Sequence, residues 1–194
     1  AWGCNLYSDV VGHFEKRNRE HIRHYDPASL DRALLEELFR RHGDARQLAA
    51  LARRDEALHV LSEPDEDEHA LDEFARIGVA SADDIRRVFT EQYFFGCEAD
   101  DPMNAMAFDA RRNPGGARLR ALFSSDIGHW DVPDMSEVLP EAWELVEREL
   151  VTESDFREFV FGNAVALWGG TNPAFFDGTR VERAARAELG RPAR

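Results

Sequence analysis

The acidic and imidazole side chains in LFSSDIGHWDVPD, residues 122–134, are the strongest candidates for chemistry in this sequence. Asp126 follows a short apolar run and precedes a loop that contains Gly128 and His129. A carboxylate at the end of a buried strand can ligate a divalent metal, or orient and deprotonate a metal-bound water. These residue types make Asp126 a candidate metal ligand and catalytic group, and His129 a candidate second catalytic residue.

A structural interpretation of the same residues stays open. An aspartate at the end of a strand often only begins a polar turn. A loop histidine beside a tryptophan, as His129 is beside Trp130, is often a packed or solvent-facing residue. Glu98 ends the other apolar run and is followed by Asp100 and Asp101, which together could form a solvated acidic loop.

Two short apolar stretches would have to position these groups. The first is QYFFGCE, residues 92–98, and the second is RALFSSD, residues 120–126. Both read as strands covered by other elements, and helical patterns around them favour parallel pairing through a right-handed crossover. In a parallel pair Glu98 and Asp126 would face the same rim, where α/β folds place active-site groups.

The rest of the chain reads as helix. Residues 1–91 are mainly helical, residues 92–130 hold the two strands, and residues 131–194 hold further helices and a tail, all within one domain. Thr152 and Asp155 resemble a capping box that opens a helix, and Gly169-Gly170 is expected to end it. Because two strands cannot make a covered sheet, the chain is either mainly helical with a minor strand pair or part of a larger α/β body, which the bare start at Ala1 favours.

Composition excludes several classes of partner. The 194 residues carry a formal net charge of -14, which would repel nucleic acid and anionic membrane surfaces. No apolar stretch approaches the roughly 20 residues of a membrane span. The two cysteines, Cys4 and Cys97, are too few for a disulfide framework, and no secretory leader is evident, so we expect a cytoplasmic protein.

The stretch from Tyr93 to Glu182 resembles the C-terminal end of metal-dependent hydrolases of the amidohydrolase-2 type. The resemblance rests on LFSSDIGHWD, on LPEAWELVERELVTESDFREFVFGNAVALWGG and on NPAFFDGTRVE. The opening AWGCNLYSDVVGHFEKRNREHIRHYDP resembles the segment after the sixth barrel strand of that family.

The resemblance implies the C-terminal part of a (β/α)8 TIM barrel with a divalent metal, zinc, at the mouth of its strands. It implies that Asp126 ends the eighth strand as metal ligand or base, that His129 contacts the rim or the substrate, and that Asn163-Ala164 is structural. The family's HxH motif has no counterpart here. We therefore expect these residues to be one part of a longer enzyme and to be inactive alone.

The expected function is that of a metal-dependent hydrolase in which activated water attacks a small carbonyl substrate, with Glu98 and Trp130 as substrate contacts. One alternative is a decarboxylase of the same superfamily, for which a substrate carboxylate could be clamped by Arg111, Arg112, Arg118 or Arg120. The other is a non-catalytic helical interaction module. We expect a homo-oligomer, because apolar helix faces would otherwise remain uncovered.

Overall fold

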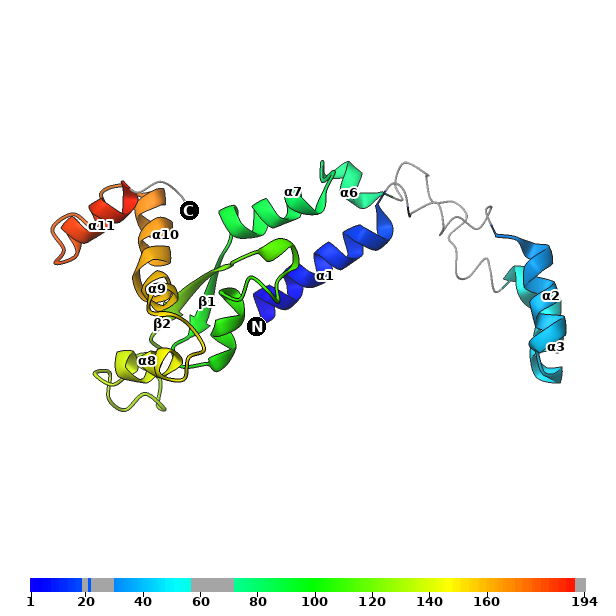
Figure 1. Ribbon diagram of the computed structural model, residues 1–194, viewed down its shortest axis with the longest axis horizontal. Coiled ribbons are helices and arrows are strands. Elements are labelled where there is room, and N and C mark those ends of the chain that lie inside the picture. Colours follow the sequence, from blue (N-terminus) through cyan, green and yellow to red (C-terminus); the bar gives the residue numbers. More distant parts are fainter. Residues whose placement is uncertain (19–20, 22–29, 57–71, 191–194) are drawn as a thin grey trace. The chain divides into compact units, whose positions relative to one another are not determined.

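The computed structural model, shown in Figure 1, describes residues 1–18, 21, 30–56 and 72–190. The chain divides into two compact units. One, which we call the strand unit, comprises Ala1–Val11 and Asp83–Arg194, and the other, the helical unit, comprises Gly12–Ala82. All the candidate site residues belong to the strand unit. Within the part of the chain that the structure describes, no helix is both long and apolar enough to cross a bilayer.

The described part of the first 91 residues is mainly helical, as predicted. Asp31 caps one of these helices by accepting a hydrogen bond from the backbone N–H of Leu34 at 2.9 Å. Asp44 and Gln47 form a capping box at the start of another. Residues 22–29 and 57–71 lie outside the described residues. Among the described residues before Ala80, the helices are α1 (Trp2–Arg17), α2 (Arg32–His42), α3 (Ala45–Ala50), the 3₁₀ turn η3 (Leu51–Arg53), and α6 (Glu73–Arg76).

Two parallel strands form the sheet of the strand unit (Figure 1). They are β1 (Phe94–Glu98) and β2 (Arg120–Ser124), each slightly shorter than the stretch predicted for it. The predicted parallel pairing is confirmed, and its register aligns Glu98 with Ser124 at the carboxyl end. The connection between the strands contains the 3₁₀ turns η5 (Pro102–Ala107) and η6 (Pro114–Gly116).

Helices cover one face of this sheet. Because side chains alternate along a strand, Phe95, Cys97, Ala121 and Phe123 share one face, and their backbone partners in the register agree with this. Phe123 packs edge-on against Phe159 with ring centroids 5.8 Å apart, and Ala121 is fully buried. We call this face the covered face.

The covered face is also closed by the start of α1 and by the helix before β1. A Cβ atom at Gly3 would lie 2.5 Å from the Phe95 ring, which shows how closely α1 approaches β1. Phe89 stacks on Phe95 with centroids 6.4 Å apart, and Tyr7 donates a 2.8 Å hydrogen bond to the carbonyl of Pro114. Phe89 belongs to the π-helical turn η4 (Val88–Gln92), which continues α7 (Ala82–Arg87).

The opposite face of the sheet is the more open one. It carries the alternate residues of the two strands, and at its carboxyl end Gly96, Glu98 and Ser124 are exposed. We call this the open face. Toward its amino end Arg120 lies over the Phe94 ring, with the guanidinium carbon 4.9 Å from the ring centroid. Of the polar residues on the open face, Glu98 and Ser124 therefore lie where the strands end, whereas Arg120 lies at the amino end.

A long helical segment follows the candidate site and packs on β2. It is assembled from α9 (Glu153–Arg157), the π-helical turn η7 (Glu158–Gly162) and α10 (Asn163–Thr171), and it is preceded by α8 (Val138–Glu147) and followed by α11 (Glu182–Leu189). The predicted capping box of Thr152 and Asp155 is present. Asn163 donates a 2.9 Å hydrogen bond to the carbonyl of Ala121 and so links α10 to β2.

The helix predicted to end at Gly169-Gly170 runs one residue further, because α10 ends at Thr171. Gly169 instead lies at a close contact between two helices. A Cβ atom there would lie 2.7 Å from a methyl carbon of Leu189, so the absence of a side chain lets α11 approach α10 closely. The described chain is thus a helix-rich α/β structure with two parallel strands.

Candidate functional site

A tight loop after β2 brings Asp126 and His129 together. Asp126 adopts a left-handed backbone conformation with φ 53°, and Gly128 follows with φ 107°. The backbone N–H of His129 donates a 3.1 Å hydrogen bond to the carbonyl of Asp126 and closes the turn. Such a conformation is uncommon for a residue with a Cβ, although aspartate tolerates it better than most. The turn carries His129 back beside Asp126.

The side chains of this loop converge on one point. His129 Nδ1 lies 2.7 Å from Asp126 Oδ2, and the two side chains are 66% and 35% exposed. Asp131 joins them, and one ligand atom from each of the three residues lies within 4.8 Å of the others. Two carboxylates and one imidazole thus meet within one loop. We call Asp126, His129 and Asp131 the loop cluster.

The loop cluster adjoins a hollow at the carboxyl end of the sheet. The hollow has a volume of about 340 Å³ and contains the predicted substrate contact Glu98 together with Asp126. Trp130, the other predicted substrate contact, is 93% exposed and is not among the lining residues. The lining is completed by Gly96, Cys97 and Ser124. Parallel pairing therefore brings two of the predicted site residues from different strands to one rim.

The donor set of the loop cluster suits a divalent cation such as zinc. Imidazole and carboxylate are common zinc ligands, and three protein ligands with one open position are typical of catalytic zinc sites. Ligands about 2.0–2.1 Å from a tetrahedral zinc lie roughly 3.4 Å apart. The three side chains would have to close in from up to 4.8 Å, which rotation of partly exposed side chains can achieve.

The contact between His129 and Asp126 limits how the two residues could share a cation. A histidine whose Nδ1–H donates to a carboxylate presents the lone pair of Nε2 on the far side of its ring from that carboxylate. His129 and Asp126 could therefore bind the same cation only after a side-chain rotation that gives up their 2.7 Å contact. The net charge of -14 further favours a cation over an anion in this hollow.

The four arginines considered as carboxylate clamps have other partners. Arg111 and Arg112 both pair with Asp109, at 3.2 and 3.3 Å. Arg118 pairs with Asp155 at 2.5 Å. Arg120 donates a 3.1 Å hydrogen bond to the carbonyl of Glu91. None of the four is among the residues that line the hollow.

Asp131 is the site residue that sequence reasoning missed. It lies two residues beyond His129, in a stretch whose polar composition is that of any surface turn. The signal that could have identified it is the spacing of Asp126, His129 and Asp131 around Gly128, because a tight turn there folds the three side chains onto one another. Comparisons with protein-family models, with curated proteins and with solved structures found no match to this chain.

Proposed function

We propose that this chain carries the metal-binding loop of a metal-dependent hydrolase of the amidohydrolase type, which acts on a small carbonyl substrate. The observation that carries the proposal is the loop cluster at the carboxyl end of β2, with Asp126 and His129 in contact at 2.7 Å. Glu98 on the neighbouring strand supplies a second acidic group at the same rim.

The proposal includes the fold. We infer that β1 and β2 are the last two strands of a (β/α)8 barrel. Two observations support this: the strands are parallel, and helices pack on the covered face while Gly96, Glu98 and Ser124 of the opposite face are exposed. In such a barrel helices cover only the outer face of the strands, and active-site groups occupy the carboxyl ends. A doubly wound sheet would instead carry helices on both faces.

Each residue of the loop cluster is assigned a role in binding the cation or in hydrolysis. His129 would bind the cation through one ring nitrogen, after a rotation that gives up its 2.7 Å contact with Asp126. Asp126 would offer Oδ1 as a ligand or accept the proton of the attacking water. Asp131 would supply the third ligand. Glu98, which also lines the hollow, would accept a hydrogen bond from the substrate.

A bound divalent cation, for which zinc is the best match to these donors, would lower the pKa of a water molecule and polarise the substrate carbonyl. Hydrolysis is preferred to decarboxylation because the arginines that would recognise a substrate carboxylate pair elsewhere and do not line the hollow.

The test is hydrolysis by the intact protein of activated esters, lactones and simple amides, before and after removal of metal with a chelator. We expect activity that is lost with the metal and restored by zinc, and a fall of about 10²- to 10⁴-fold in kcat/KM for Asp126→Asn. Asp134→Asn is the matched control and should keep full activity, because Asp134 is exposed and its carboxylate accepts hydrogen bonds from Ser136. Activity that survives the chelator, or equal activity of Asp126→Asn and the wild type, would refute the proposal.

A further inference from the structure

The helical unit contains a helical hairpin at residues 30–56, which we call the leucine hairpin (Figure 1). Its first arm is α2, and its second arm is built from α3, η3 and the residues that follow them. Two ion pairs link the arms, one between Arg32 and Asp55 at 2.7 Å and one between Arg54 and Glu36. Because the start of the first arm pairs with the end of the second, the two arms run antiparallel.

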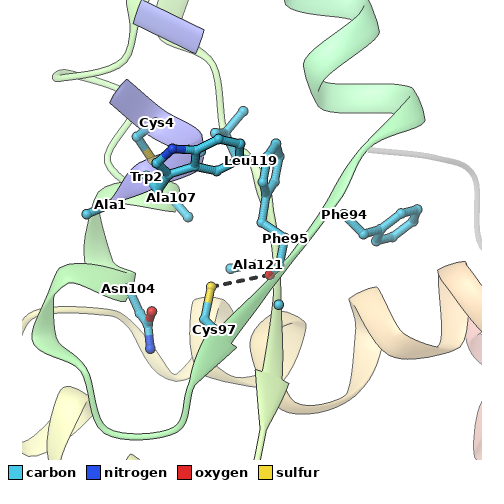
Figure 2. Close-up of a pocket in the computed structure, with 12 residues that line it drawn as sticks. Ala1, Trp2, Cys4, Phe94, Phe95, Cys97, Asn104, Ala107, Leu119 and Ala121 are labelled. Atoms are coloured by element: carbon cyan, nitrogen blue, oxygen red, sulfur yellow. Dashed lines mark hydrogen bonds between the residues drawn. The ribbon is translucent and has the colours of Figure 1, made fainter. Parts of the chain in front are cut away.

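The leucine hairpin has no core of its own. None of residues 30–56, all of which the structure describes, is buried. The strand unit differs in this respect, because Ala107, Leu119 and Ala121 are buried around its two strands (Figure 2). Helices shorter than about 12–15 residues are marginal in water, and most helical stability in proteins comes from packing of an apolar face. The leucine hairpin therefore needs a further surface to pack against.

The exposed side of α2 carries a short apolar row with a charge at each end. Leu34 and Leu38 are 48% and 44% exposed, and residues four apart lie one above the other on a helix. Asp31, the cap of α2, lies three residues before Leu34, and the exposed Arg41 lies three residues after Leu38. We call Asp31, Leu34, Leu38 and Arg41 the α2 row.

The spacing of the α2 row is the same in both directions along the helix, three, four and three residues. When two copies of α2 pack antiparallel, Leu34 of each copy lies opposite Leu38 of the other. The same pairing brings Asp31 of each copy opposite Arg41 of the other. A parallel pairing would instead place Asp31 against Asp31 and Arg41 against Arg41. The α2 row is therefore complementary in charge and in apolar contact to a second copy of itself, as a twofold interface requires.

The charge of the leucine hairpin as a whole also favours a second copy. Residues 30–56 contain six arginines and six carboxylates, whereas the whole chain carries a formal net charge of -14. Two acidic chains repel one another over most of their surface. The leucine hairpin is a neutral region at which they can meet.

We propose that two copies of this chain associate through their leucine hairpins, with the two α2 helices packed antiparallel along the α2 row. Two such hairpins supply the four helices of a bundle, in which the exposed leucines become the core. The interface lies in the helical unit, so the proposal does not depend on the proposed hydrolase.

The first test measures the mass of the full chain in solution by sedimentation equilibrium at increasing concentrations. The wild type should reach the mass of two chains. Leu34→Glu/Leu38→Glu should stay monomeric, because its carboxylates would be buried in the interface, although glutamate is as good a helix former as leucine. Leu139→Glu/Leu150→Glu, at two exposed leucines of the strand unit, adds the same charge and should dimerise like the wild type.

Two results of this experiment would overturn the proposal. A wild type that stays monomeric up to its solubility limit would show that something other than a second copy covers the α2 row. Dimers of Leu34→Glu/Leu38→Glu as stable as those of the wild type would place the interface elsewhere.

The second test addresses the antiparallel arrangement. Arg41→Glu replaces two attractive contacts per dimer with repulsive ones, so we expect the Kd of the dimer to rise by about three- to thirtyfold. Arg183→Glu, at an exposed position of α11, adds the same charge and should leave the Kd unchanged. Equal Kd values for the two variants would refute the antiparallel α2 row. If Leu34→Glu/Leu38→Glu fails to fold, the comparison of Arg41→Glu with Arg183→Glu still decides the proposal.

Discussion

His129 Nδ1 lies 2.7 Å from Asp126 Oδ2, across a turn in which Asp126 itself has a positive φ of 53°. The contact places the imidazole of one residue beside the carboxylate of the other. Backbone conformations that disfavour a side chain persist where the surrounding structure imposes them, and they gather at functional sites. Asp126 therefore has two distinct features, a carboxylate in contact with an imidazole and an unfavourable backbone conformation.

Replacing Asp126 by glycine separates these two features. Glycine adopts a positive φ without the Cβ clash, so Asp126→Gly should leave the free energy of unfolding unchanged or raise it by up to about 1 kcal/mol. Loss of the exposed pair with His129 should cost little. The same variant should lose zinc affinity. Urea unfolding and zinc titration on one preparation check both expectations.

Glu149→Gly is the matched control. Among the described residues, Asp126 and Glu149 are the two that have a positive φ without being glycine, and the φ of Glu149 is 57°. It should be stabilised in the same way and should bind zinc like the wild type. Marked destabilisation of Asp126→Gly alone would show that the Asp126 carboxylate supports the fold of the loop, and would favour the structural interpretation of this residue.

The hydrogen bond from Asn163 to the carbonyl of Ala121 is expected to stabilise the packing of α10 on β2. Ala121 is fully buried, so Asn163→Ala would leave its carbonyl without this donor. We expect the free energy of unfolding to fall by about 1 to 2 kcal/mol. Asn5→Ala, on the exposed side of α1, should change it by less than about 0.5 kcal/mol. Equal effects in urea unfolding would show that the bond contributes nothing.

Stability should fall in acid partly through Asp155. Burial disfavours its charged form, but hydrogen bonds from Arg118 and Thr152 outweigh burial and hold the pKa of Asp155 below its usual value. A carboxylate with a lowered pKa contributes stability above its unfolded pKa of about 3.9, and that contribution is lost as the pH falls through the folded pKa.

Asp155→Asn should therefore be less stable than the wild type at pH 7, and the difference should shrink below about pH 4. Asp9→Asn, an exposed position on α1, serves as the control and should show no such convergence. Urea unfolding at several pH values measures the difference. A gap between Asp155→Asn and the wild type that stays constant from pH 7 to pH 3 would contradict this account.

The sequence predicted the elements that local patterns determine. The aromatic run before Glu98 and the apolar run before Asp126 identified both strands, and their separation by a long connection identified parallel pairing. The capping box at Thr152 was recognisable because its two residues are three positions apart. These patterns involve residues close together in the chain, so they can be recognised without knowledge of the tertiary structure.

The features that were missed depend on contacts between distant residues or on backbone turns. Gly169 looked like a helix end because glycine disfavours helices, but its contact with Leu189 is visible only once α11 is in place. Asp131 enters the loop cluster only through the turn at Gly128.

The most direct test of the metal-binding loop is a calorimetric titration of the metal-free chain with Zn²⁺. The wild type should bind about one zinc per chain, as expected for a single three-ligand site. Asp126→Asn and His129→Gln should each weaken binding by at least about 10- to 100-fold, while Asp134→Asn should not change it. Absence of saturable binding by the wild type, or equal affinity of the wild type and Asp126→Asn, would contradict the assignment of Asp126, His129 and Asp131 as a metal centre.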